Sequence, residues 1–175
     1  MKDKLKNAIQ SCFDHLLVED GSLFDCPIED ESPYDSRKLH EVCLNHRLAN
    51  QFQDKVLPLL RSQDMFVDLE FNREGVNYKK VRFEGKDKVL RPDIIIHNRK
   101  AGQEKRNFLV VECKKEGASE TEIDEDKKKV AAFLQDERYD YSFGLQVIYG
   151  KQKVVKGVLF FKDKLGIHQE IIRDH

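Results

Sequence analysis

Arg91–Lys115 opens with Arg-Pro-Asp-Ile-Ile-Ile-His at residues 91–97 and closes with Asn-Phe-Leu-Val-Val-Glu-Cys-Lys-Lys at residues 107–115. The two runs are short, apolar and rich in β-branched residues, and the hydrophilic segment between them contains Gly102. This pattern predicts two adjacent β-strands joined by a turn.

The polar residues inside these strands are placed by the alternation of side chains along a strand. Asp93 shares a face with Ile95 and His97, and Glu112 shares a face with Lys114. The sequence therefore predicts that two carboxylates and one lysine converge at one end of a sheet.

Burying an unpaired carboxylate is costly, so Asp93 and Glu112 require a compensating charge. A hard divalent cation such as Mg²⁺ or Mn²⁺ fits this role, with the backbone carbonyl of Cys113 as a third ligand. A water on the cation would supply the nucleophile for a phosphodiester, and Lys114 would orient it and offset charge on the phosphate. The alternative is a structural ion pair between Asp93 and Lys114, with Glu112 at a solvated edge.

The strength of this signal lies in the combination of two motifs. An acid-x-Lys triplet starts at four positions in the chain, but only the one at Glu112 follows a four-residue apolar run. Pro-Asp occurs once, at Pro92, inside the neighbouring predicted strand. Together the two motifs indicate a site more strongly than either does alone.

With these residues the chain resembles the PD-(D/E)xK nuclease superfamily, whose signature is Pro-Asp on one strand and Glu-x-Lys on the next. Glu41, followed by residues 46–49, is similar to the first core helix of that superfamily, which often carries an extra acidic ligand. The resemblance covers about residues 36–161 and is to small, mostly uncharacterised bacterial members. It implies a restriction-endonuclease-like αβββαβ core and a metal-dependent nuclease, although some members of the superfamily have lost activity.

Periodicity and capping residues predict one α/β (α+β) domain over residues 1–175, with a central mixed sheet flanked by helices, an extra N-terminal helix and a C-terminal edge hairpin. Residues 1–35 form the N-terminal helix and an acidic loop, and about 36–161 form the core. The expected helices are 2–18, 35 or 36 to Pro58, and 119–135. The expected strands are 65–71, 91–97, 107–115, 143–149, 153–161 and 167–172. The expected irregular segments are the acidic loop at 14–35, a turn at 72–75 and a charged stretch at 78–88 that no core buries.

The predicted helices also have expected inner faces. On the second helix, Glu41 falls in line with Leu48 and is expected to point toward the sheet; the alternative is a surface Glu41 paired with Asn45 or Arg47. The helix over residues 119–135 is expected to bury its inner stripe, which comprises Ile123, Lys127, Val130, Ala131 and Leu134. Cys12 and Cys43 are expected to be small buried hydrophobes.

Charge is unevenly distributed along the chain. The formal net charge is -1, but residues 72–115 carry 13 Lys or Arg against 6 Asp or Glu. This excess surrounds the predicted site, where it favours contact with phosphates, and Arg73, Arg91 and Lys115 are the candidates for such contacts. The alternative is that these side chains are merely solvated.

Other classes are disfavoured by what the sequence lacks. No apolar run approaches the roughly 20 residues of a membrane span, and the first residues show no signal-peptide pattern, which predicts a cytoplasmic protein without a membrane partner. The cysteines have no metal-site spacing, and no glycine-rich phosphate loop is present.

The leading hypothesis is a Mg²⁺- or Mn²⁺-dependent nuclease acting on nucleic acid, with DNA favoured over RNA. Its catalytic residues are Asp93, Glu112, Lys114 and Glu41, and its metal ligands are Asp93, Glu112, Glu41 and the Cys113 carbonyl. One alternative is a non-catalytic module that binds nucleic acid or protein and keeps the nuclease fold. Another is a defence or toxin component gated by a partner, for which the N-terminal helix is a candidate partner or homodimer surface.

Overall fold

A six-stranded mixed sheet forms the centre of the protein in the computed structural model, which describes residues 1–24, 41–61, 64–74, 77–100, 102–150 and 155–174. The strand order is β1-β6-β7-β8-β9-β10, and every neighbouring pair is antiparallel except β7 and β8, which are parallel. Its strands are β1 (Phe66–Leu69), β6 (Ile94–His97), β7 (Asn107–Lys115), β8 (Phe143–Tyr149), β9 (Val155–Asp163) and β10 (Gly166–Arg173).

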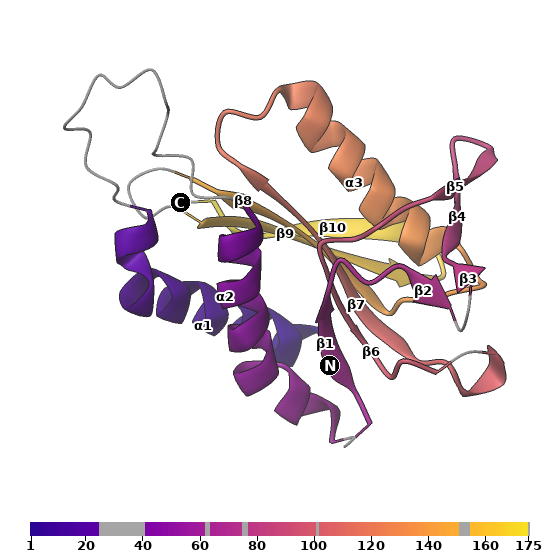
Figure 1. Ribbon diagram of the computed structural model, residues 1–175, viewed down its shortest axis with the longest axis horizontal. Helices are drawn as coiled ribbons and strands as arrows, with labels where there is room; N and C mark the ends of the chain where they lie inside the picture. The colour runs from indigo at the N-terminus through magenta and orange to yellow at the C-terminus, as the bar shows by residue number, and fades with distance from the viewer. Residues whose placement is uncertain (25–40, 62–63, 75–76, 101, 151–154, 175) are drawn as a thin grey trace.

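Helices cover both faces of the sheet (Figure 1). α1 (Lys2–Glu19) and α2 (Glu41–Lys55) lie on one face, and α3 (Glu120–Gln135) lies on the other. Between β1 and β6 the chain forms two small hairpins beside the sheet, which pair β2 (Arg73–Glu74) with β3 (Asn77–Tyr78) and β4 (Lys80–Phe83) with β5 (Lys86–Val89). Short 3₁₀ turns occur at η1 (Gly21–Leu23), η2 (Leu57–Leu60) and η3 (Gly102–Glu104).

Each face of the sheet has its own apolar layer, because side chains alternate along the strands. Leu109 and Val111 of β7 belong to the layer that α1 and α2 cover. Val110, between them, belongs to the layer under α3. In that second layer α3 approaches the sheet closely, since a Cβ atom on Gly144 would lie 2.2 Å from Cγ1 of Val130.

Much of the predicted element order is confirmed. The N-terminal helix, the parallel pairing of β7 with β8, and the C-terminal hairpin of β9 and β10 are present. At the start of α3, the Ser119 side chain accepts from the backbone of Glu122, and the Glu122 side chain accepts from the backbone of Ser119, which is the expected capping box. Cys12 is buried, as predicted.

Several expectations are wrong, among them the turn at residues 72–75, where Arg73 and Glu74 form the short strand β2. Cys43 is exposed, because the buried stripe of α2 runs through Leu44 and Leu48 instead. α1 ends at Glu19, close to the predicted end at residue 18, so the acidic loop does not begin at residue 14. The part of that loop from residue 25 onward and the expected start of the second helix lie outside the described residues. The charged stretch at 78–88 contributes to the core, because β4 alternates charged residues with buried Val81 and Phe83.

No helix in the described parts of the chain is both long enough and apolar enough to cross a membrane.

At the edge strand β1, Asp68 contacts a histidine and an arginine. Its carboxylate lies 2.8 Å from Nε2 of buried His97 and accepts a 2.7 Å hydrogen bond from Nε of Arg99. Burial lowers the pKa of His97, and the opposing effect of Asp68 does not restore it. The folded protein therefore prefers neutral His97.

This preference predicts a pH-dependent loss of stability on acidification. The unfolded chain protonates His97 near its ordinary pKa of 6.5, whereas the folded chain resists, so the contribution is present above that pH and is lost as pH falls below it. We expect the unfolding free energy of the wild type, measured by urea titration, to fall relative to that of His97→Gln between about pH 7 and 5. Equal pH profiles for the two proteins would contradict this assignment.

Candidate functional site

The candidate site lies where β7 extends beyond its neighbour β6. β6 has 4 residues and β7 has 9, and the pairing of the two strands ends at Ile94 opposite Val111. Among the described residues, no strand pairs with β7 beyond Val111 on that side. Alternate N–H groups of a strand point to the same side, so Cys113 and Lys115 both direct their N–H groups into the space past the end of β6.

Two carboxylates occupy this position. Oδ2 of Asp93 accepts a hydrogen bond of 2.7 Å from the backbone N–H of Cys113. Oε2 of Glu41 accepts one of 3.1 Å from the backbone N–H of Lys115. Because both backbone groups of a strand residue point to the same side, the Cys113 carbonyl faces this space as well.

Glu41 reaches β7 because it is the first described residue of α2 and that helix packs on the sheet through Leu44, Asn45 and Leu48. The inward orientation predicted for Glu41 is what the structure has. The alternative partner Arg47 instead lies 3.3 Å from Asp20.

Glu112 and Lys114 point toward α3, on the face of the sheet opposite α2. Nζ of Lys114 lies 3.5 Å from Oδ2 of Asp126. Nζ of Lys129 lies 2.7 Å from Oδ1 of Asp126 and 3.7 Å from Oε2 of Glu112. Asp126 therefore links two lysines, one from the strand and one from the helix.

The sequence pattern did not predict a role for Asp126. It predicted that Lys127 and Ala131 lie on the buried side of α3. In the structure Asp126 is buried, Lys127 and Ala131 are only half-buried, and Ala132 and Phe133 belong to the buried set. A helical stripe drawn back one turn from Val130 passes through Asp126, so the spacing itself was available as a signal. An acid is seldom buried on an apolar stripe, so residue type alone does not indicate this position.

Three carboxyl groups at this position, those of Asp93, Glu112 and Glu41, resist ionisation. Burial raises the pKa of Asp93 to about 6, and the Glu41 and Asp126 charges add to this effect against the Cys113 N–H and Lys114. Burial and then the Asp93 charge raise the pKa of Glu112 well above its ordinary value. Burial also raises the pKa of Glu41, against the attraction of Lys114.

The two lysines of the cluster, Lys114 and Lys129, keep their charge more strongly than an ordinary lysine does. Burial alone would lower the pKa of Lys114 and of Lys129, but the surrounding carboxylates outweigh it and raise both values. Four carboxyl groups, those of Glu41, Asp93, Glu112 and Asp126, thus face two ammonium groups. The cluster has an excess of acid that one divalent cation would neutralise.

Side chains alone do not complete a metal site here. Among the described residues, no three Asp, Glu, His or Cys side chains lie close enough together to hold a metal ion. A site at this position would therefore combine Asp93 and Glu112 with the backbone carbonyl of Cys113. The buried oxygen Oε1 of Glu112, which no hydrogen-bond donor reaches, fits such a role.

The Cys113 thiol faces away from this space. It is fully buried, lies 3.5 Å from the hydroxyl of Tyr149, and burial raises its pKa well above the ordinary value. A thiol in this state is a poor nucleophile, so the chemistry of Cys113 is confined to its backbone.

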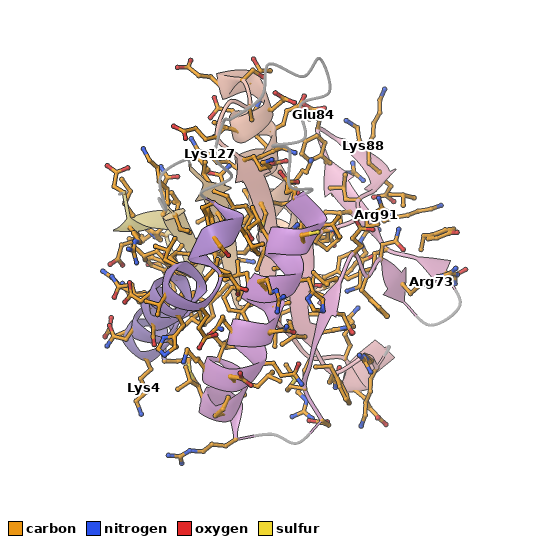
Figure 2. The ribbon with its side chains drawn as sticks, turned by 60° about the vertical axis from the view of Figure 1, so that its left-hand side comes forward. Lys4, Arg73, Glu84, Lys88, Arg91 and Lys127 are labelled. Carbon is orange, nitrogen blue, oxygen red and sulfur yellow. The ribbon has the colours of Figure 1, made fainter. Side chains whose placement is uncertain are left out.

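Two of the candidate phosphate-binding residues, Arg73 and Arg91, lie outside the carboxylate cluster. Figure 2 shows Arg73 and Arg91 projecting on the same side of the molecule as Lys88. Arg91 pairs with Glu70 at 3.2 Å, and the guanidinium of Arg73 lies 4.7 Å from the ring centre of Tyr78.

Lys115 and Lys79 occupy other positions. Lys115 is half-buried at the end of β7, beside the candidate site. Lys79 from the same basic stretch is buried and donates to the Tyr141 hydroxyl at 2.9 Å, so it is part of the core.

Comparison with protein-family models, with curated proteins and with solved structures found no match to this chain.

The raised pKa of Glu112 predicts that removing its charge stabilises the metal-free protein. A folded-state pKa above the unfolded value of 4.5 means that stability is lost as pH rises above 4.5. In a chelator at neutral pH, Glu112→Gln should unfold with a free energy higher by roughly 1 kcal/mol or more, and the gain should vanish near pH 4.5. Chemical denaturation measures it.

Glu125→Gln is the matched control, because Glu125 is an exposed acid on α3. We expect no gain from that change. A Glu112→Gln variant that is less stable than the wild type at neutral pH would show that the carboxylate is fully compensated without a ligand.

Proposed function

We propose that this protein is a metal-dependent nuclease that hydrolyses phosphodiester bonds, with DNA as the favoured substrate and a restriction-endonuclease-like core. The observation that carries the proposal is the meeting of Asp93, Glu112 and Lys114 at the end of β7, with Glu41 supplied by α2. Two acids and a lysine on neighbouring strands are the residues that the superfamily signature requires.

The order of elements supports the same proposal. α2, β1, β6, β7, α3 and β8 follow one another along the chain, with the two small hairpins inserted between β1 and β6. β8 returns parallel to β7 after α3. This is the helix, three strands, helix and strand order that the resemblance implies.

A divalent cation is part of the proposal, and Mg²⁺ or Mn²⁺ suits the available oxygen ligands. Asp93, Glu112 and the Cys113 carbonyl would hold it, with Glu41 as a supplementary ligand. When bound, such a cation lowers the pKa of a coordinated water and offsets the charge of the phosphate.

The chain's own residues prepare the site for that chemistry. The N–H of Cys113 fixes the Asp93 carboxylate, and the N–H of Lys115 fixes that of Glu41. Lys114, 28% exposed on its side chain, is accessible to a phosphate oxygen while Asp126 limits its motion. Its ammonium group would orient the attacking water and stabilise charge on the phosphate.

The alternative of a non-catalytic module has one observation in its favour. Asp93 and Glu41 already have a structural role, because each accepts a backbone N–H that β6 leaves unpaired. Lys129 likewise approaches Glu112 without any metal. Under this alternative the cluster stabilises the end of β7, and the protein binds nucleic acid or a partner without cleaving it.

Cleavage assays separate the two functions. The wild type with Mg²⁺ or Mn²⁺ should cleave single-stranded or double-stranded DNA, and a chelator should abolish the activity. Lys114→Ala should reduce the rate by about a hundredfold or more, because one charged group is lost from the transition state. Asp93→Asn should abolish both cleavage and binding of Mn²⁺ by calorimetry at this position.

Lys127→Ala is the control for Lys114→Ala, since Lys127 lies on α3 and pairs with Asp124 away from the cluster. It should cleave at the wild-type rate. If the wild type cleaves RNA but not DNA in a metal-dependent way, the proposed substrate is wrong and the proposed mechanism still holds. If the wild type, purified without metal, neither binds Mn²⁺ nor cleaves any of these substrates, the nuclease proposal is contradicted and the non-catalytic alternative is supported.

A further inference from the structure

β10 forms one edge of the central sheet. Among the described residues it pairs with β9 and with no other strand. A strand of 8 residues in this position presents a row of backbone N–H and C=O groups with which another strand can pair. The opposite edge, β1, has only 4 residues. β10 is therefore the edge that has more backbone to offer another chain.

The regular part of β10 after its first residue is the segment 167–171, here called the open segment. It consists of Ile167, His168, Gln169, Glu170 and Ile171. Beyond it, a bulge lies between Ile171 and Arg173, and the Gln10 side chain donates a 2.9 Å hydrogen bond to the Ile172 carbonyl. The end of β10 is thus distorted and occupied, so pairing with another chain is confined to the open segment.

The open segment divides its side chains between the two faces of the sheet. Ile171 is the register partner of Val158, which packs against the apolar layer under α3, so Ile171 lies on that face. Ile167 and Gln169 share this face, because side chains alternate along a strand. The histidine and the glutamate lie on the other face, where α1 supplies two lysines to the glutamate. Ile171 is 63% exposed, so α3 leaves this large apolar side chain in solvent.

The open segment is complementary to itself. Its residues are, in order, apolar, basic, polar, acidic and apolar. When two copies run antiparallel with Gln169 opposite Gln169, each Ile167 faces Ile171 of the other copy. In the same register each His168 faces Glu170 of the other copy. Apolar pairs and pairs of opposite charge directly across two strands stabilise a sheet.

Other registers lack this match. Two identical edges can shift only in steps that keep outward backbone groups opposite each other. Centring the pair on His168 sets two histidines opposite each other and Ile167 opposite Gln169. Centring it on Glu170 sets two carboxylates opposite each other, which is destabilising. The register centred on Gln169 is therefore the one in which both charge and apolar character agree.

We propose that this protein forms a symmetric homodimer in which the open segments of two copies pair antiparallel, with the two-fold axis at Gln169. Backbone hydrogen bonds between the two β10 strands provide the affinity, and the facing side chains fix the register. The two central sheets then form one continuous sheet. This surface differs from the N-terminal helix, which the sequence indicated as a candidate dimer surface, and it does not depend on metal binding or cleavage.

Disulfide formation tests the register directly. Cα atoms directly opposite each other on antiparallel strands lie about 4.5 to 5.5 Å apart, a distance that a disulfide spans. Replacing Cys26 and Cys43 with serine leaves only buried native thiols. In that chain, Gln169→Cys should form a disulfide-linked dimer on mild oxidation. Ile171→Cys should not, because its two copies would lie about 14 Å apart along the strands.

Sedimentation equilibrium measures the dimer itself. The wild type should approach twice the chain mass of 20.5 kDa as its concentration is raised. Ile171→Lys should raise the dissociation constant of the dimer about tenfold or more, because it removes both isoleucine pairs. His168→Glu should also raise it, since it sets like charges opposite each other, whereas His168→Lys should keep or lower it.

Val18→Lys is the matched control for Ile171→Lys, because Val18 is an apolar residue of α1 that is 83% exposed and lies outside β10. It should leave the dissociation constant unchanged. The opposite effects of His168→Glu and His168→Lys separate loss of the interface from loss of the fold.

Three results would overturn the proposal. One is a wild type that stays at the mass of one chain up to about 1 mM. Another is a dimer whose dissociation constant neither Ile171→Lys nor His168→Glu changes, since its interface lies elsewhere. The third is a disulfide that forms at residue 171 and not at residue 169, since it excludes the register centred on Gln169.

Discussion

The overhang of β7 beyond β6 is the constraint on which the candidate site depends. A strand end without a neighbour leaves backbone N–H groups unpaired, and burying them unpaired is costly. Asp93 and Glu41 satisfy the N–H groups of Cys113 and Lys115, one from the turn before β6 and one from α2. The acids thus have a structural reason to gather at this end of the sheet, and their gathering creates an excess of negative charge.

That excess is only partly relieved by the protein. Lys114 and Lys129 compensate two of the four carboxyl groups, and Asp126 fixes both lysines in place. The burial of Glu112, and then the charge of Asp93, keep the pKa of that acid high. The divalent cation of the proposed function would relieve this cost.

The main elements were predictable because strong local signals agree with the tertiary structure. The apolar runs of β6 and β7, the capping box at Ser119 and the apolar periodicity of α1 each specify an element without help from distant residues. The hairpin of β4 and β5 was not predicted, since Val81 and Phe83 are its only buried apolar residues and most of its other residues are charged. Neighbouring Lys79 is buried among aromatic rings.

The candidate site was predictable to a similar degree. The positions of Asp93, Glu112 and Lys114 follow from strand alternation, and Glu41 follows from its place on the apolar stripe of α2. Asp126 and Lys129 were missed, because their contacts with Lys114 and Glu112 depend on which turn of α3 lies over β7 and β8. Neither helix periodicity nor strand alternation fixes that registration; the close packing of Val130 against Gly144 does.

The location of bound metal tests the central claim most directly. In a two-dimensional NMR spectrum of the backbone amides, substoichiometric Mn²⁺ broadens the signals of residues near the ion. If the end of β7 holds the metal, the amides of Asp93, Cys113 and Lys115 should broaden first, before those of acidic surface residues such as Glu84 and Asp163. Broadening confined to such surface acids, or no selective broadening at all, would contradict a metal centre at this position.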